Sequence, residues 1–337
     1  MRVPAVVLLP ETRVIQGRIS VEFVLNQLIN GLQRGSIYAL IALGYTMVYG
    51  VLRLINFAHG EVFMLGAFVA YFAATLLGAG LPVALATAMA FCALLGLLIE
   101  AGVYRPLRRR PRLAALIAAI GVSIFLSHFV QALRLEFRDA HGDLVRFSGA
   151  SYIPFPARQL VADRAYRLWP EREVHVTRIQ ILNLGVSVLL MGSLWFLVRR
   201  TMLGRAMRAC ANNKDALALM GVNVNRVIAI TFALGAALAG AAGLLNALTY
   251  PRIDATMGLM YGLKAFVAAV LGGIGSIPGA MLGGLLMGLA EVTASALLPG
   301  SPVDYTPLAD GVAFAILILA LLIRPQGIFG EPVSEKV

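Results

Sequence analysis

Long apolar runs alternate with short polar segments along most of the chain. The runs lie at residues 35–54, 57–78, 81–103, 113–133, 179–198, 227–249 and 306–323. Each is close to the roughly 20 residues that a helix needs to cross about 30 Å of hydrocarbon. A glycine-broken stretch at 258–298 adds either one span with a re-entrant half or two short spans. The pattern predicts an all-α, polytopic membrane protein with eight or nine membrane elements.

The composition agrees with a membrane location. Hydrophobic residues make up 59% of the 337 residues and charged residues 13%, about half of the roughly 25% that is typical of soluble domains. The formal net charge of +11 does not require a nucleic-acid partner, because the arginines lie mainly in loops and membrane topology explains them. The two cysteines, Cys92 and Cys210, provide neither a disulfide framework nor the spacing of a zinc site, so no metal is expected.

Basic loops orient the spans. Residues 104–112 contain five arginines and no acid, which places them in the cytosol under the positive-inside rule. Counting crossings from there puts 134–178 outside, 199–226 inside and the tail from Arg324 inside. The N-terminal side is then outside, unless the amphipathic stretch Val21–Arg34 forms an extra element.

We expect one transmembrane domain over residues 21–337, preceded by an N-terminal extension at 1–20. The extracytoplasmic insert 134–178 has eight basic and six acidic residues, which predicts a polar, irregular cap. Such a cap either meets an extracytoplasmic partner or is simply solvated.

The cytosolic loop 199–226 is the most informative polar segment. It holds six basic residues and one acid, and its middle carries the signals of one short helix. Asn212 or Asn213 can cap the free amides at its start. Asp215 falls in the first turn, and Gly221 can take the left-handed conformation that ends a helix. A short capped helix against a membrane domain is a surface that another protein can push.

A glycine-rich segment at 271–284 contains six glycines and one proline, so a straight helix is not expected there. Broken backbone at membrane depth is tolerated where it is buried in protein or borders a wet cavity. The resulting pathway candidates are Gly272, Gly273, Gly275 and Ser276. The alternative is close helix packing, since glycines recur here at four-residue spacing, and both roles are compatible. No Gly-Lys-Ser or Gly-Lys-Thr ending follows, so the segment is not a phosphate loop.

The turn between the first two runs holds Asn56, His59 and Glu61 near the cytosolic boundary. Asn56 is a candidate cap for the next helix. A proton relay or a metal pair is an alternative for His59 and Glu61, but one histidine and one carboxylate lack the further ligands that a metal needs. We expect them to brace the turn by hydrogen bonds and to line an inner gate.

Ionisable residues inside the runs are few, and each is a functional candidate. Glu291 lies midway along its run and either pairs with a neighbouring helix or contacts substrate. Lys264 lies near the outer end of its run, where it can snorkel. The scarcity of buried carboxylates argues against a proton- or sodium-driven carrier.

Four stretches carry a family resemblance, namely Gly35–Gly50, Ile55–Glu61, Ala209–Gly221 and Ala268–Gly284. The chain resembles the permease subunits of bacterial ABC importers for branched-chain amino acids. The resemblance implies an inner-membrane subunit that forms a heterodimer with a second, related permease. It also implies two cytosolic ATP-binding subunits and a periplasmic substrate-binding protein as partners. ATP and Mg would be bound by the ATPases, so the chain itself is expected to hold no cofactor and no catalytic residue.

In importers of this kind, a loop with the pattern Glu-Ala-Ala, three residues, then Gly docks in a groove of the ATPase. The docking candidates are therefore Asn212, Asn213, Asp215, Ala216, Leu217 and Gly221. The chain has Asp215 in place of Glu, Leu217 in place of Ala, and Thr231 in place of a usual downstream Ile. We expect docking to survive these changes while its fine geometry differs.

Leucine, isoleucine and valine are the expected substrates, because a mostly apolar pathway suits aliphatic side chains. Related permeases serve urea, short amides or aromatic acids, which remain alternatives. A secondary carrier would instead transport alone under an ion gradient, and an intramembrane enzyme would depend on His59 with Glu61. Copurification of an ATPase pair would favour the importer over both.

Overall fold

The computed structural model describes residues 21–108, 110–162, 164–167 and 174–296, with parts of 311–330. Within these residues, seven helices are long and apolar enough to cross a membrane. They are α1 (Val21–Leu52), α2 (His59–Leu77), α3 (Leu81–Ile99) with its continuation, α5 (Arg112–Ala132), α7 (Arg178–Arg200), α10 (Val224–Thr249) and α12 (Ile277–Ala296). A shorter apolar helix, α11 (Met257–Gly272), raises the described membrane elements to eight. The all-α, polytopic prediction is confirmed.

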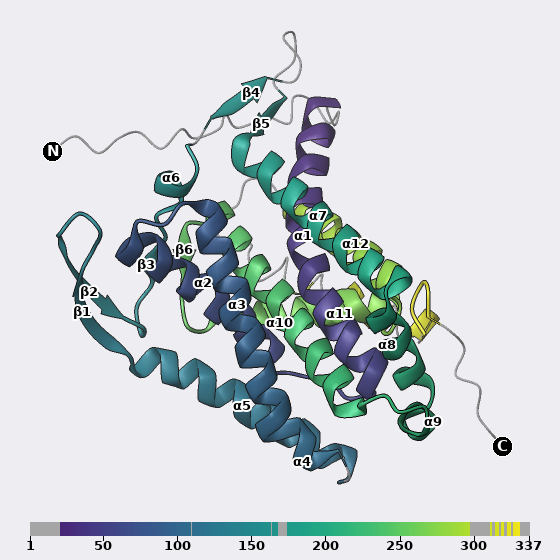
Figure 1. Ribbon diagram of the computed structural model, residues 1–337. Helices are drawn as coiled ribbons and strands as arrows, with labels where there is room; N and C mark the ends of the chain where they lie inside the picture. The colour runs from purple at the N-terminus through teal and green to yellow at the C-terminus, as the bar shows by residue number, and fades with distance from the viewer. Residues whose placement is uncertain are drawn as a thin grey trace, which may run out of the picture.

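Two helices, α1 and α10, form the centre of the bundle (Figure 1). α1 packs on α7, α10, α11 and α12, while α10 also packs on α2 and α3. Both bury most of their length, whereas α3, α5 and α7 bury less than a third of their spanning windows. The exposed side chains of these outer helices are mainly apolar, as expected for helices that face lipid.

Glycines set how closely α12 approaches α1. A Cβ atom added at Gly284 would overlap the backbone of Ala39, and one at Gly288 would overlap the backbone of Gly35. The two helix backbones therefore meet directly, as in the small-residue packing of membrane helices. The packing interpretation of the glycine repeat is confirmed for this helix pair.

The N-terminal half of α1 is longer than the apolar pattern predicts. Val21–Arg34 is not an extra element, because α1 runs through it without a break to Leu52. The first run at 35–54 covers only the second half of this helix. Polar residues such as Gln27 and Asn30 interrupt the apolar pattern, since they line a polar cavity rather than lipid.

The glycine-broken stretch contains two helices, the shorter apolar α11 and the span-length α12, and both predicted alternatives, one span with a re-entrant half and two short spans, stay open. The turn between them uses Gly273 and Gly275, which have φ values of +103° and +101°. Only glycine reaches this region without strain. The turn reverses the chain at the cytosolic end, where Gly275 lies near Gly50 of α1.

The insert 134–178 is more ordered than the predicted irregular cap. It contains the antiparallel hairpin of β1 (Arg134–Arg138) with β2 (Leu144–Ser148) and the pair β4 (Ala165–Arg167) with β5 (His175–Thr177). The short strand β3 (Ile153–Pro154) pairs with β6 (Arg252–Ile253), and α6 (Ala157–Leu160) follows β3. Local hairpin pairing satisfies the backbone of a polar segment outside the helical bundle, which is why the irregular expectation was wrong. The extension 1–20 and most of the run 306–323 lie outside the described residues.

Candidate functional site

The loop 199–226, which the sequence predicts to be cytosolic, folds into two helices: the predicted short helix in its middle and a further helix before it. α8 (Met202–Asn212) follows α7 after a turn at Thr201, whose side-chain oxygen accepts a 3.2 Å hydrogen bond from the Gly204 N–H. Thr201 therefore both ends α7 and caps the start of α8. α8 contacts α1 and α10 as well as α7, so the loop lies against the central membrane helices.

The second helix, α9 (Lys214–Leu219), has the predicted start and stop signals. Asn213 accepts 3.0 Å hydrogen bonds from the N–H groups of Asp215 and Ala216. Gly221 follows with φ +79°, the left-handed conformation predicted for the helix end. The cap is therefore Asn213, while Asn212 is the last residue of α8.

Apolar side chains of α9 point in opposite directions. Leu217 is 4% exposed and belongs to the hydrophobic core, whereas Leu219 is 90% exposed and Met220 is 79% exposed. Figure 1 places α9 at the end of the bundle opposite the β4–β5 hairpin. Exposed apolar side chains outside the spanning region are typical of a protein contact site. Sequence reasoning missed Leu219 and Met220, because six residues are too few for periodicity to show which leucine faces inward.

A buried charge cluster joins the end of α3 to the start of α10. A π-helical turn (Glu100–Tyr104) and α4 (Arg105–Leu107) extend α3, and the fully buried Glu100 carboxylate accepts hydrogen bonds from Arg105 at 2.8 Å and from Arg108. Arg108 also donates a 2.6 Å bond to Asn225 in the first turn of α10. Burial lowers the pKa of the Arg108 guanidinium below its ordinary value, but an arginine remains charged.

The turn between α1 and α2 differs from the prediction. α2 begins after Ala58, and Asn56 makes no cap bond, so the capping expectation for Asn56 is wrong. Asn56 lies two residues ahead of the capping position, too early to reach the first free amides. Its side-chain oxygen instead accepts a 3.2 Å bond from the Tyr104 hydroxyl.

His59 and Glu61 are buried in the first turn of α2. The His59 ring lies edge-on to Tyr45 of α1, with ring centroids 4.9 Å apart, and Glu61 accepts a 3.2 Å bond from Ser123 of α5. Within the described part of the chain, His59 Nε2 and Glu61 Oε2 make no hydrogen bond. The described residues hold no group of three His, Cys, Asp or Glu side chains that could bind a metal.

The glycine turn borders a cavity of about 110 Å³ at the cytosolic ends of α1, α8 and α12. Gly275 and Thr46 line it, and Thr46 Oγ1 has no hydrogen-bond partner among the described residues. Ser276 accepts a 3.3 Å bond from the Gly279 N–H at the start of α12. Gly272 packs against Gly279, so the structure places it in helix packing. A role of this turn in the pathway stays a prediction.

Glu291 of α12 joins three helices. Its Oε1 accepts hydrogen bonds from Lys264 of α11 at 2.8 Å and from Arg34 of α1 at 3.2 Å. Its Oε2 accepts a 2.5 Å bond from the Tyr38 hydroxyl. The predicted pairing of Glu291 with neighbouring helices is confirmed. Lys264 is buried in this pair, so the expectation that it snorkels is wrong, because a carboxylate inside the bundle lies within its reach.

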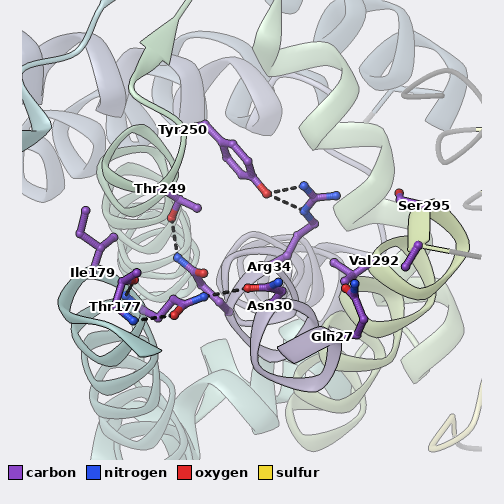
Figure 2. Close-up of a pocket in the computed structure, with 12 residues that line it drawn as sticks. Gln27, Asn30, Arg34, Thr177, Ile179, Thr249, Tyr250, Val292 and Ser295 are labelled. Atoms are coloured by element: carbon purple, nitrogen blue, oxygen red, sulfur yellow. Dashed lines mark hydrogen bonds between the residues drawn. The ribbon is translucent and has the colours of Figure 1, made fainter. Parts of the chain in front are cut away.

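Beside this cluster, a cavity of about 560 Å³ opens between α1, α7, α10 and α12 (Figure 2). It lies where α1 begins and α10 ends, which is the extracytoplasmic side in the orientation predicted from the basic loops. The Tyr250 hydroxyl accepts hydrogen bonds from Arg34 Nε at 2.9 Å and from its Nη2. Sequence reasoning named no residue of this cavity, since its parts come from four helices that are distant in the sequence.

The family model of the permease component of branched-chain amino acid transport systems matches residues 27–321. The high-affinity branched-chain amino acid transport system permease protein BraD of Pseudomonas aeruginosa is 45% identical over 323 residues, which cover 93% of this chain and 98% of BraD. The high-affinity permease protein LivH of Escherichia coli is 42% identical over 327 residues, covering 94% of this chain and 98% of LivH.

A more distant similarity reaches an archaeal protein. The probable branched-chain amino acid transport permease LivH of Methanocaldococcus jannaschii is 26% identical over 297 residues, covering 88% of this chain and 89% of that protein. No solved structure matches the chain.

Proposed function

Since the chain belongs to the permease family of branched-chain amino acid transport systems, we propose that it is the membrane subunit through which an ABC importer moves leucine, isoleucine and valine. Proteins of this family are transport components rather than enzymes. The chain is a multi-pass protein of the inner membrane. Its apolar helices suit the passage of aliphatic side chains.

Partner subunits supply the energy in this proposal. Two cytosolic subunits bind ATP and Mg²⁺ and hydrolyse the nucleotide, and a substrate-binding protein delivers the amino acid from outside. Residues 21–337 act as one permease domain without a cofactor of their own. A second permease completes the pathway, and the exposed spanning windows of α5 and α7 leave room for it as well as for lipid.

The observation that carries the coupling proposal is the outward apolar tip of α9, formed by Leu219 and Met220. These side chains lie in a basic cytosolic loop, and a hydrophobic groove of an ATPase would remove them from water. Asn213 and Gly221 hold the helix ends in shape. Leu217 is buried and packs α9 against the rest of the permease, so it supports the docking helix without contacting the ATPase itself.

Motion of α9 reaches the membrane through direct contacts. α9 contacts α8 and α10, and α8 contacts α1. The Asn225–Arg108–Glu100 contacts tie the start of α10 to the end of α3. In this proposal, closure of the ATPases displaces these packed helices as rigid elements.

The inner gate of the proposal lies where α1 ends. Asn56 lies in the turn after α1, and His59 and Glu61 lie in the first turn of α2. Gly275 and Ser276 form the turn before α12. His59 Nε2 and Glu61 Oε2, which have no hydrogen-bond partner among the described residues, support the assignment, because such buried polar atoms are suited to water or a polar substrate.

The test compares two exposed methionines of the same cytosolic loop. Met220→Asp places a charge on the proposed docking face, and Met202→Asp places one at the start of α8, where the native methionine is 74% exposed. We expect Met220→Asp to reduce leucine uptake and substrate-stimulated ATP hydrolysis at least tenfold, whereas Met202→Asp retains both. Membrane insertion, measured by the amount of purified permease, should be equal.

Equal uptake by the two variants would reject α9 as the docking element. If neither variant nor the unmodified chain copurifies with an ATPase, the importer proposal itself fails.

A further inference from the structure

We propose that the cavity between α1, α7, α10 and α12 is a binding subsite for the carboxylate of the transported amino acid, with Arg34 as the residue that recognises it. This inference rests on the proposed importer function and identifies a substrate contact within it. The cavity volume of about 560 Å³ lies within the range of roughly 300–1,000 Å³ that is usual for small-molecule sites.

The cavity lining carries a positive charge, which favours an anionic ligand. Among its described lining residues, Arg34 is the one charged side chain, and the other polar groups are amides and hydroxyls. Figure 2 shows the Arg34 side chain between Tyr250 and the end of α12. Glu291 contacts Arg34 without belonging to the cavity lining. A carboxylate entering the cavity therefore meets a cation and no lining acid.

Arg34 keeps donors for such a ligand. A guanidinium has five N–H donors. The structure uses Nε–H and one Nη2–H for Tyr250 and one Nη1–H for Glu291. Two N–H groups on the terminal nitrogens then remain, by the contacts among the described residues, as donors for a ligand carboxylate. Tyr250 and Glu291 fix the guanidinium from two sides and act as positioning residues.

Two apolar side chains line the cavity as well. Ile179 of α7 and Val292 of α12 line the same cavity as Arg34. A ligand with a carboxylate and an aliphatic side chain can contact both kinds of wall at once. A simple inorganic anion would use only the charged one.

Buried polar groups continue from the cavity toward the middle of α7 and α10. Thr249 lines the cavity and accepts hydrogen bonds from Gln33 at 3.0 Å and from Asn183 at 2.6 Å. Asn183 and Ser187 are fully buried one helical turn apart on α7, and their Oδ1 and Oγ atoms make no hydrogen bond among the described residues. Unpaired buried oxygens are costly unless a partner arrives. They extend the polar surface inward, as a transport route requires.

The experiment uses a single introduced cysteine as a reporter of occupancy. Ser295 lines the cavity, whereas the native Cys92 and Cys210 are 0% and 1% exposed. Ser295→Cys in the complete importer complex, reconstituted in nanodiscs of neutral lipid, is labelled with a small maleimide while leucine or leucinamide is titrated. Leucine at ten times its Kd should slow labelling about tenfold by mass action, and leucinamide should not.

Two further variants assign the carboxylate to Arg34. Arg34→Lys keeps the positive charge but replaces the planar guanidinium by an ammonium group. We therefore expect the protection of the introduced cysteine by leucine to fall at least tenfold. The matched control is Arg252→Lys, because Arg252 lies on the same side of the membrane over the Tyr152 ring and outside the cavity lining. This control should retain full protection.

Equal protection by leucine and leucinamide, or no protection by either, would overturn the proposal. Protection that appears without leucine when anionic lipid is added would overturn it too, because the ligand would then be a lipid headgroup. Copurification of the ATPases and basal ATP hydrolysis are recorded for every variant. Loss of copurification and of basal ATP hydrolysis indicates failure of the importer proposal. If both are retained, a negative labelling result contradicts only the proposed carboxylate subsite.

Discussion

Leu217 and Leu219 are two residues apart in α9, yet the first is buried in the permease core and the second is almost fully exposed to solvent. The helix thus has one apolar side chain that attaches it to the membrane helices and another that has no contact of this kind. Leu217 lies in the core cluster with residues of α8 and α10. A protein that binds the exposed face of α9 can therefore move the membrane helices, because Leu217 on the other face packs against them.

The end of α9 depends on a glycine. Gly221 has φ +79°, and a Cβ there would meet nothing within 4 Å. A substitution is therefore strained by conformation alone, by about 1–2 kcal/mol for a residue with a branched side chain. We expect Gly221→Val to reduce leucine uptake several-fold and Gly221→Asn to retain most of it, because asparagine tolerates the left-handed region. Uptake that is equal in the two variants would contradict this role.

The contact between α1 and α12 depends on the absence of side-chain atoms. Gly284→Ala places a methyl group into the backbone of Ala39 and should destabilise the helix pair by roughly 1–3 kcal/mol. Gly185→Ala is the control, because a Cβ on this α7 glycine meets nothing within 4 Å. The midpoint of thermal unfolding in detergent should fall for Gly284→Ala and stay the same or rise for the control. A reversed order would refute the packing argument.

The Glu291 cluster is expected to be a stability element. Glu291→Gln removes the carboxylate that Lys264 and Arg34 share, and loss of one member of a buried ion pair typically costs about 3–5 kcal/mol. Lys264→Met combined with Glu291→Gln should recover part of that free energy of unfolding, because the lysine charge is then absent as well. Denaturant titration of the purified variants measures the coupling. Strictly additive losses would show that the two residues do not interact.

Cys210 provides a pH-dependent reporter of α8 packing. Burial raises the pKa of the Cys210 thiol above its ordinary value, although Lys214 and Arg108 act in the opposite direction. Because the thiolate is the reactive form, alkylation should be slow near neutral pH and should rise at a higher pH than in the unfolded chain. The measurement is the maleimide labelling rate of Cys92→Ser permease against pH, in native and denatured protein. Identical profiles would contradict the burial of Cys210.

The spans were predictable because lipid imposes one rule on every helix that crosses it. The predicted limits of the run at 179–198 differ from α7 by at most two residues at each end. The start of α1 was missed, since Gln27 and Asn30 face a polar cavity and break the apolar pattern. The pattern of apolar residues therefore predicts a helix where its side chains face lipid or the protein core, and not where they line a polar cavity.

The helix α9 was predictable from local signals, because the cap at Asn213 and the stop at Gly221 are properties of neighbouring residues. The buried charge clusters, by contrast, were not predictable from local signals. Arg34 meets Glu291 across 257 positions of sequence, and no local pattern encodes which helices become neighbours. The same limit explains why Asn56 was assigned to a cap when its partner is Tyr104.

We propose that the outer face of α9 is the contact through which cytosolic ATPases move this permease. A photoreactive amino acid at position 220, in place of the exposed Met220, tests it in the intact importer. We predict a crosslink to the ATP-binding subunit whose yield changes between the nucleotide-free and ATP-bound complex. Crosslinks to lipid alone, or none with an ATPase that is present in the complex, would contradict the account.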